Sequence, residues 1–574
     1  MQCLAVDTQS KKRIRNVFFA YPWLPLRILC ATLATALITS CQSRESAVIT
    51  KGQASFEKNC SSCHNFRSNG IGPQLGGLTE TVSEEWVRKF IKDPKALIDN
   101  GDERAGMLFG RYNTYMPSFA HLNDEDLDAI VAFLKTKPAP PQKEFKPDGT
   151  EIKDPIASKI EMSDLVVDLQ VVATIPPSSN EGQKTRICKL DFRPDTKDVF
   201  VVDLRGKLYQ LTGKGPQVYL DMAKEMPKFI DKPGLATGFG SFAFHPDFAK
   251  NGLLYTTHVE SPGSGVADFA YPDSIKVMLQ WVLSEWKTDK PGAFPFEGKS
   301  RELFRANMVH SFHGVQEITF NPLAKAGDED YGLLYVGVGD GSSVEMGYPF
   351  LAHSKDKVWG AILRIDPKGN NSKNRHYGIP KTNPFSNEIF AYGFRNPHRI
   401  SWSRKGQILA SNIGHHNIES LYIVEAGRDH GWPEREGTFA MNYRKTMDFV
   451  YPLPADDANN NYTYPVAEYD HDEGNAISGG LEYWGNTLQP LKGKYLFGDI
   501  VKGRLFYVEM GELAIGKQAV IKEFQLTVNG EKKTLTELTG GDKVDVRFGR
   551  DHNGEMYILT KPDGRVYKIV GAKV

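Results

Sequence analysis

Three residues near the N-terminus have the spacing that attaches a covalent cofactor. Cys60, Cys63 and His64 follow the order Cys-x-x-Cys-His within the segment KNCSSCHNF. In this motif the two thiols form thioether bonds to a haem, and the histidine binds the iron as its proximal ligand. The sequence therefore predicts a c-type haem, which transfers one electron at a time.

A methionine further along the chain can supply the second axial ligand of the haem iron. Met116 is followed by Pro117 in YNTYMPSF, whereas the alternative ligand, Met107, has no proline after it. A thioether ligand raises the reduction potential of the iron, which suits an electron acceptor. With an apolar helical face over residues 86–91 and a final helix capped by Asn123, residues 42–137 resemble a class I cytochrome c, a small all-α domain.

The first 41 residues have the pattern of an export signal. Four Lys and Arg residues at positions 11–15 precede an uncharged apolar run over 28–40, which at 13 residues is shorter than the ~20 that span a bilayer. The run ends in ITSC and resembles the lipobox of bacterial lipoproteins, with Cys41 as the lipidated residue. A plain signal peptide and an uncleaved anchor are the alternatives. We expect an exported periplasmic lipoprotein of the bacterial cell envelope, and Gln42 after the cysteine favours the outer membrane.

Composition separates the rest of the chain from this helical part. Lys+Arg and Asp+Glu both number 70, which gives no support to nucleic acid as a partner. With 53 Gly, 33 Pro and 11% aromatic residues, the chain is typical of an all-β protein with many short strands. Residues 138–164 are rich in proline and charge, and we expect an extended, semi-rigid linker there.

Glycine turns followed by short β-rich runs recur along residues 165–574. The runs begin at Asp198, Asn251, Tyr331, Gly406, Gly493 and Gly554. Six such units predict a six-bladed β-propeller, a fold that binds ligands where its loops converge at one mouth. The predicted fold is an all-β six-bladed β-propeller with a small all-α cytochrome c domain at the N-terminus.

Longer segments of this region resemble the glucose/sorbosone dehydrogenase family. They include GFGSFAFHPDFAKNGLLY, HGVQEITFNP, LLYVGVGDG, GFRNPHRISWS and FGRDHNGEMYILT, and together they span about residues 165–572. The resemblance implies a propeller that binds pyrroloquinoline quinone (PQQ) with calcium (Ca2+) and oxidises a sugar.

The resemblance also assigns roles to particular residues. His313 matches the catalytic base, and a histidine can accept the proton of a sugar hydroxyl near neutral pH. His310, three residues earlier, is the alternative. Arg395 and Asn396 match the Arg-Asn pair that contacts the quinone, whose three carboxylates favour a guanidinium partner.

Other positions depart from the family pattern. The Arg-x-Arg expected before the last blade is replaced by Arg547 and Arg550 out of register, and Lys502 lies one place from the expected quinone-binding lysine. The calcium loop reads IGHHNIES, in which Gly414 and His415 offer carbonyl oxygens and one acidic residue remains.

Two classes of function follow from these patterns. The first is a quinohaemoprotein that oxidises an aldose or related alcohol with PQQ and passes electrons through its own haem to a downstream cytochrome or oxidase. A tether of this length keeps the haem at an effective concentration of about millimolar over the propeller. The second is a non-catalytic propeller that binds a sugar or a protein beside an electron-transfer cytochrome. A propeller that holds a different redox cofactor or metal is a third alternative.

Overall fold

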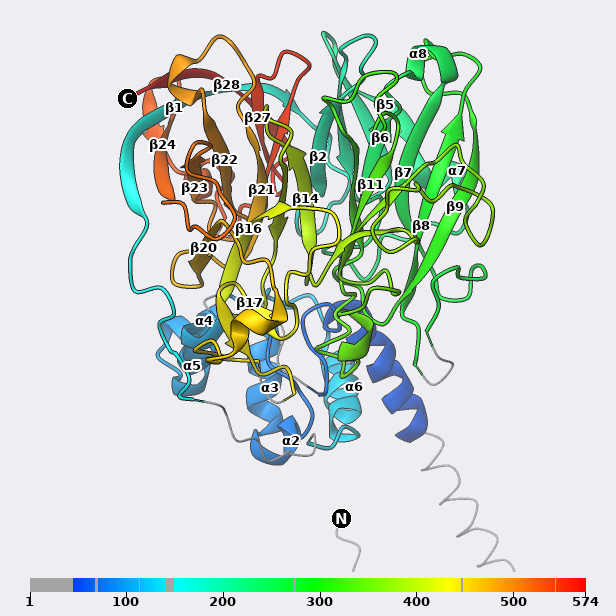
Figure 1. Ribbon diagram of the computed structural model, residues 1–574. Coiled ribbons are helices and arrows are strands. Elements are labelled where there is room, and N and C mark those ends of the chain that lie inside the picture. The colour runs from blue at the N-terminus through cyan, green and yellow to red at the C-terminus, as the bar shows by residue number, and fades with distance from the viewer. Residues whose placement is uncertain are drawn as a thin grey trace, which may run out of the picture.

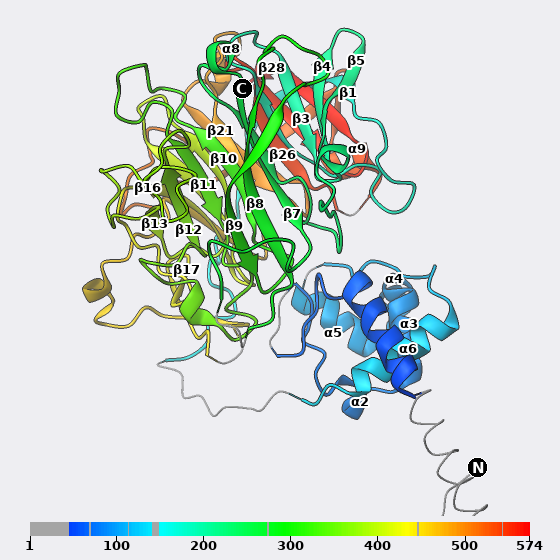
Figure 2. The same ribbon diagram turned by 90° about the vertical axis from the view of Figure 1, so that its right-hand side faces the viewer.

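The computed structural model describes residues 45–67, 71–112, 114–139, 149–271, 275–444, 447–541 and 543–574. A small helical domain lies against one end of a larger β-domain, and the two views at right angles agree on this placement (Figures 1 and 2). The predicted signal segment with Cys41 lies outside the described residues. Within the described ranges no helix has both the length and the apolar character to cross a membrane.

The helical domain contains the helices that its sequence predicts at residues 86–91 and after Asn123, together with further short helices. A helix covers residues 45–59, and the other helices are α2 (Leu78–Thr81), α3 (Glu84–Lys92), α4 (Pro94–Asp99), α5 (Glu103–Tyr112) and α6 (Asp124–Lys135). The Asn123 side chain accepts a hydrogen bond from the Asp126 N–H at 2.8 Å, as the predicted N-cap requires. A Cβ at Gly52 would lie 1.9 Å from the Ala129 carbonyl oxygen, so this glycine allows the first and last helices to cross in contact.

Among the described residues, two parallel strand pairs join three units of the β-domain into one 13-stranded sheet, and the domain consists mainly of four-stranded antiparallel units. They are β2 (Ile187–Phe192), β3 (Val199–Asp203), β4 (Lys207–Thr212) and β5 (Gly215–Asp221); β6 (Ser241–Phe244), β7 (Leu253–Glu260), β8 (Leu279–Lys287) and β9 (Lys299–Met308); β10 (Val315–Phe320), β11 (Leu334–Val338), β12 (Ala361–Ile365) and β13 (Ile389–Tyr392); β14 (Pro397–Trp402), β15 (Ile408–Asn412), β16 (Ile418–Val424) and β20 (Ala467–Asp470); β21 (Ile477–Glu482), β22 (Lys494–Asp499), β23 (Leu505–Glu509) and β24 (Lys522–Val528); and β26 (Val546–Arg550), β27 (Met556–Thr560) and β28 (Arg565–Lys573) with β1 (Glu161–Thr174).

The β-domain also contains shorter strands, helices and turns. They are β17 (Arg435–Glu436), β18 (Phe439–Met441), β19 (Val450–Tyr451), β25 (Glu531–Lys533), α7 (Met222–Glu225), α8 (Phe248–Asn251), α9 (Leu535–Thr539) and the 3-10 turns at Pro349–Leu351, Asp457–Asn460 and Gln489–Leu491.

The units are joined at both their inner and outer edges. The first strands contact one another in the order β2, β6, β10, β14, β21 and β26, and β26 contacts β2 again. β1 pairs with β28, so the first and last strands of the β-domain share one sheet. This arrangement fixes the N-terminal ends of the first strands relative to one another, which matters because the candidate site lies there.

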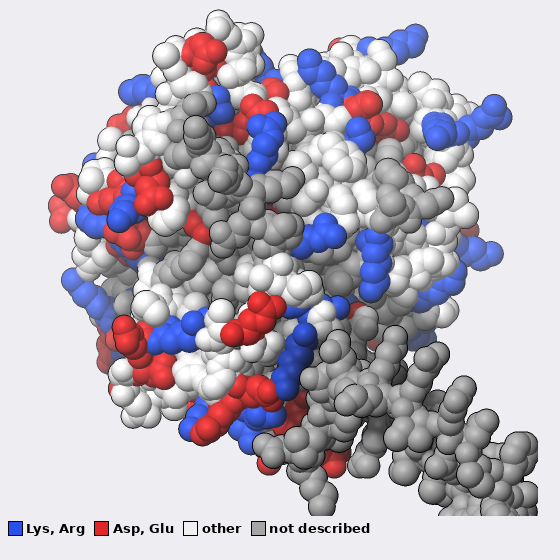
Figure 3. Space-filling view, turned by 90° about the horizontal axis from the view of Figure 1, so that it is seen from below, with Lys and Arg blue, Asp and Glu red and all other residues white. Residues whose placement is uncertain are grey.

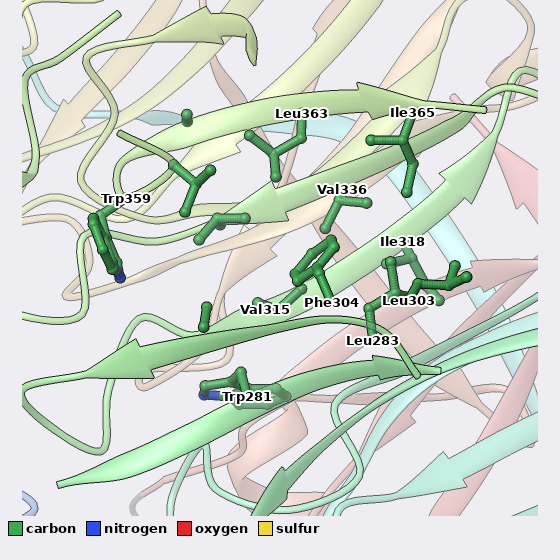
Figure 4. Packing of buried hydrophobic residues seen from close by; sticks show 14 of the residues in the cluster. Trp281, Leu283, Leu303, Phe304, Val315, Ile318, Val336, Trp359, Leu363 and Ile365 are labelled. Atoms are coloured by element: carbon green, nitrogen blue, oxygen red, sulfur yellow. The ribbon is translucent and has the colours of Figure 1, made fainter. Parts of the chain in front are cut away.

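Large apolar side chains fill the space between neighbouring units. Trp281, Phe304, Ile318, Val336 and Leu363 come from five strands of the β6–β9 and β10–β13 units and are all fully buried (Figure 4). Such close packing leaves little freedom for a strand to shift. The frame that carries the candidate site is therefore rigid.

The second half of the predicted linker packs on the β-domain, which corrects the expectation of a free spacer over residues 138–164. Ile152 forms a bridge with Val450, and the Ile156 N–H donates to Asp470 Oδ2 at 3.1 Å. Prolines remove only their own N–H groups, so the isoleucines between them still pair. β1 then begins at Glu161, and residues 140–148 lie outside the described ranges.

The end of the molecule that carries the helical domain has a mixed charge distribution. Lys and Arg side chains are interspersed with Asp and Glu side chains on this face (Figure 3). This pattern agrees with the zero net charge of the chain.

Candidate functional site

A mainly apolar cavity of about 220 Å³ lies inside the helical domain. Its lining includes Cys60, Cys63, His64, Met116, Trp86, Val87, Phe90, Ile91, Leu108, Phe109, Ile130 and Leu134. Two thiols, an imidazole and a thioether around an apolar space are the donor set and setting of a c-type haem. The residues present therefore fit this group.

The orientation of His64 is fixed by its surroundings. Its Nδ1 lies 2.8 Å from the Pro73 carbonyl oxygen, which leaves Nε2 as the ligand atom for iron. A Cβ at Gly72 would lie 2.4 Å from His64 Cε1, so only glycine lets the chain pass this close to the ring. The structure brings Met116 to the same cavity, whereas Met107 is 61% exposed and lies outside it.

A second cavity, of about 190 Å³, lies at the end of the β-domain that faces the helical domain. We call it the axial cavity, because its lining comes from the beginnings of the first strands of all the units. These residues are Cys188, Gly240, His313, Gln316, Arg395, Asn396, His398, Arg399, Ala476 and Arg547. First strands that start at one end of the domain bring these distant residues together.

His313 and Asp340 form a buried pair beside this cavity. His313 Nδ1 lies 2.7 Å from Asp340 Oδ1, and Asp340 also accepts hydrogen bonds from the Ser342 N–H at 2.8 Å and Trp432 Nε1 at 2.9 Å. Three partners on one carboxyl group hold the imidazole in place. When Nδ1 carries the proton, Nε2 is the acceptor of the ring.

The backbone and burial of His313 both indicate a functional role. Its φ of 53° is unusual for a residue other than glycine, and such backbone strain concentrates at functional sites. Burial lowers the pKa of His313 well below its ordinary value. The imidazole is therefore neutral at pH 7, the state in which it can accept a proton.

Arg395 lines the axial cavity, but its guanidinium is already paired. Its Nη2 and Nε lie 2.6 and 3.0 Å from Glu345 Oε1, and its Nη1 donates to the Gly414 carbonyl. The group also lies over the Trp432 ring, with 5.6 Å between its Cζ and the ring centroid. Arg395 is thus less available to a bound carboxylate than the sequence predicts.

The two cavities share part of their lining. Ile71, Tyr112 and Thr114 of the helical domain, together with Leu235 and Lys543 of the β-domain, line both.

A buried hydrogen bond joins the two domains beside these cavities. His310 Nε2 lies 2.6 Å from the carbonyl oxygen of Ser61, which stands within the Cys-x-x-Cys-His segment. His310 is therefore engaged with the helical domain and does not line the axial cavity, which leaves His313 as the base candidate.

Comparison with known families agrees with this geometry. The model of the Glucose / Sorbosone dehydrogenase family matches residues 185–568, and the Cytochrome c model matches residues 49–137. The chain belongs to the glucose/sorbosone dehydrogenase family. Its family domain includes all of the first strands that line the axial cavity.

Relatives of this family member carry names of different kinds. The chain is 26% identical to the HIPL2 protein of Arabidopsis thaliana (62% of this chain, 56% of the relative) and 24% identical to the Hedgehog-interacting protein of Homo sapiens (65% and 49%). It thus spans about half the length of these relatives. The PQQ-bound aldose sugar dehydrogenase of Streptomyces coelicolor is similar in structure, with 18% identity, a TM-score of 0.47, and coverage of 71% of this chain and 98% of that one.

The family comparison predicted some cationic residues of the axial cavity and missed others. Arg547, which is out of register with the family pattern, lines the cavity. Lys502 is not among the lining residues, and its ammonium donates to the carbonyls of His471 and Asp472. Lys543 and Lys561 line the cavity instead. No motif marked them, since each lies in a loop or at a strand end without a fixed spacing from the other cavity residues.

The predicted calcium loop does not fit a bound Ca2+ in this arrangement. The Gly414 carbonyl already accepts from the Arg395 guanidinium, whose positive charge would repel a second cation. The Gly414 and His415 N–H groups donate to the carboxylates of Glu419 and Glu436 at 3.3 and 2.6 Å. These two acids are therefore committed to the backbone, and the prediction that Gly414 and His415 hold calcium is not supported.

Asp340 was missed although its sequence carried a signal. It is the next-to-last residue of LLYVGVGDG, two positions after β11 ends at Val338, and acidic residues often close such runs in this chain. The end of a strand next to a catalytic candidate is where an orienting carboxylate is expected.

Proposed function

We propose that this chain is a quinohaemoprotein dehydrogenase that oxidises an aldose sugar or a related alcohol with PQQ and passes the electrons to its own haem c. The observation that carries the proposal is the shared lining of two cavities: one is lined by His313, which pairs with Asp340, and the other is lined by Cys60, Cys63, His64 and Met116.

The axial cavity has groups suited to a flat, triply carboxylated cofactor. Arg547, Lys543, Lys561 and Arg399 supply cationic groups, and the Asn396 side chain is buried among the lining residues. Bound PQQ supplies a two-electron acceptor for the carbon-bound hydrogen of the substrate. The charges of the lining residues favour the three carboxylates of such a ligand.

His313 performs the proton chemistry in this proposal. Its neutral imidazole accepts the proton of the substrate hydroxyl at Nε2 while Asp340 holds Nδ1. General-base catalysis of this kind contributes about 10²–10⁴ to a rate.

A haem held by Cys60, Cys63, His64 and Met116 would lie next to the axial cavity, because the two cavities share lining residues. The His310–Ser61 hydrogen bond holds the haem-attachment segment to the β-domain, and Arg67 Nη1 donates to the Met346 carbonyl at 3.0 Å. With the acceptor held in the same chain, no diffusing molecule is needed for the first transfer. From the haem, electrons pass to a downstream cytochrome or oxidase.

We also infer that the β-domain is a closed six-bladed propeller. Support comes from the contacts of the first strands, which run from β2 to β26 and return to β2. The pairing of β1 with β28 would then join the two ends of the domain within one blade.

A binding module is the second candidate function. It is favoured by the paired state of Arg395 and by similarity to a protein whose name describes an interaction with Hedgehog. In that case the propeller would hold a sugar or a protein beside an electron-transfer cytochrome.

The proposed cellular location rests on the N-terminal signal alone. We propose an exported lipoprotein, periplasmic and anchored through Cys41, with the outer membrane favoured by Gln42. Labelled palmitate should enter the wild type and not Cys41→Ala.

Equilibrium binding of PQQ to the haem-loaded full chain tests the proposed function. We expect one PQQ per chain at micromolar concentration, measured by absorbance after dialysis, with and without Ca2+. If no PQQ binds under either condition, the enzyme proposal fails and the binding-module alternative replaces it.

A further inference from the structure

One histidine of the axial cavity has no hydrogen-bond partner among the described residues. The His398 side chain is 4% exposed, and neither Nδ1 nor Nε2 has a partner. Buried polar groups are nearly always hydrogen-bonded, so each exception calls for an explanation. Because His398 lines the cavity, a bound ligand can supply the missing partner.

Arg547 and Lys561 line the axial cavity together with His398, and they share one carboxylate. Arg547 Nη2 and Lys561 Nζ lie 3.0 and 3.1 Å from the same oxygen of Asp545, and Arg547 Nε has no partner among the described residues. The side chains of Arg547, Lys561 and Asp545 are each at least 94% buried. An excess of positive charge among buried groups is costly in free energy. An anion bound in the cavity would balance this positive charge.

We propose that His398, Arg547 and Lys561 form a carboxylate-binding subsite in the axial cavity. The two cations attract the carboxylate, and the imidazole N–H donates to one of its oxygens. The carboxylate belongs either to PQQ, in which case this inference rests on the proposed function, or to an acidic sugar such as a uronate.

This assignment differs from the role that the family resemblance gives to Arg395. The Arg395 guanidinium already has Glu345 and the Gly414 carbonyl as partners, so a ligand would have to replace them. Among the residues that the structure describes, His398 has no partner to lose. A ligand carboxylate therefore gains more binding free energy next to His398 than next to Arg395.

The substitution His398→Leu tests the subsite without breaking a hydrogen bond of the protein. We would measure the affinity of the haem-loaded full chain for PQQ, for the PQQ trimethyl ester, for glucuronate and for glucose. Loss of a hydrogen bond to a charged group should weaken binding of the carboxylate-bearing ligand about tenfold to a hundredfold. Binding of the ester and of glucose should change less than twofold.

Two further variants complete the test. Lys561→Met should weaken binding of the same ligands. Lys568→Met is the control, because its ammonium lies 3.2 Å from Asp551 Oδ2 and Lys568 does not line the cavity. The haem absorbance spectrum and the melting temperature report whether each variant is folded.

The outcomes distinguish the two proposals. If glucuronate binds the wild type and depends on His398 while PQQ does not bind, the subsite stands and the proposed function fails. If PQQ binds and its affinity depends on His398, both stand. If neither carboxylate binds, or if folded His398→Leu and Lys561→Met bind both as tightly as the wild type, the subsite proposal is overturned.

Discussion

The haem cavity and the axial cavity lie side by side but are built in opposite ways. The haem cavity is mainly apolar, and three of its four haem-binding residues come from the short segment Cys60–His64. The axial cavity contains charged side chains and takes much of its lining from strand beginnings between Cys188 and Arg547. A covalent cofactor is specified by a local motif, whereas a cavity that binds by charge is specified by the whole fold.

The two cavities should also respond differently to amino-acid substitutions. The first depends on a few ligand atoms, so single substitutions should abolish one property and leave the fold intact. The second depends on a balance of buried charges, so substitutions there should produce graded effects that vary with pH. The following experiments compare the two on this basis, from the largest expected effect to the smallest.

Removing the base should have the largest effect and should leave the haem cavity untouched. His313→Ala should lower the rate of substrate-driven haem reduction about 10²–10⁴-fold, because general-base catalysis is lost. Stopped-flow absorbance at the haem bands measures this rate. The exposed His376→Ala is the control; a loss of less than tenfold in His313→Ala would remove His313 from the base role.

Substitution of the methionine ligand should change the properties of the haem and leave the axial cavity unchanged. Met116→Ala should retain the covalent haem, abolish the near-infrared sulfur-to-iron band and lower the reduction potential, since a thioether ligand raises it. Met107→Ala should leave the spectrum and the potential unchanged, because that side chain is exposed. Persistence of the band in Met116→Ala would show that another residue binds the iron.

The charge of the axial cavity should make quinone binding depend on pH. Burial lowers the pKa of Lys561 to about 8, with Asp545 opposing this shift and Arg547, Arg186 and Lys543 adding to it. A group with this pKa is charged below pH 8, so PQQ affinity should be highest there and fall up to about tenfold per pH unit above it. Lys561→Met should bind weakly with a flat profile between pH 7 and 9. A wild-type affinity that is constant over this range would contradict the account.

The contact between the domains should have the smallest effect. His310→Ala removes one buried hydrogen bond, worth about 0.5–1.5 kcal/mol, and should slow haem reduction about two- to tenfold while PQQ affinity stays the same. Lys276→Ala is the control, because its 3.7 Å ion pair with Glu57 is exposed and contributes little. An unchanged rate in His310→Ala would mean that this bond does not position the haem.

Much of the fold could be predicted because its signals are local. The N-cap at Asn123 and the haem ligands at 60–64 each depend on neighbours within a few residues. The expected β-rich runs contain strands, for example β7 in the run from Asn251 and β22 in the run from Gly493.

The axial cavity could be predicted only in part. Lys502 was expected in it because of its place in the chain, but its ammonium points to two backbone carbonyls instead. Lys561 and Asp545 form an ion pair across 16 positions of sequence, and Asp340 meets His313 from the next strand. Such pairs exist only once the strands are in register, so no spacing in the sequence specifies them.

The most direct test of the central claim is a single-turnover experiment on the PQQ-loaded full chain. An aldose is mixed with oxidised protein in the absence of any mediator, and haem reduction is followed by absorbance at low protein concentration. We predict that the haem is reduced at a rate independent of protein concentration, because the acceptor belongs to the same chain. Haem that stays oxidised although PQQ is bound and aldoses and alcohols are present would contradict the claim.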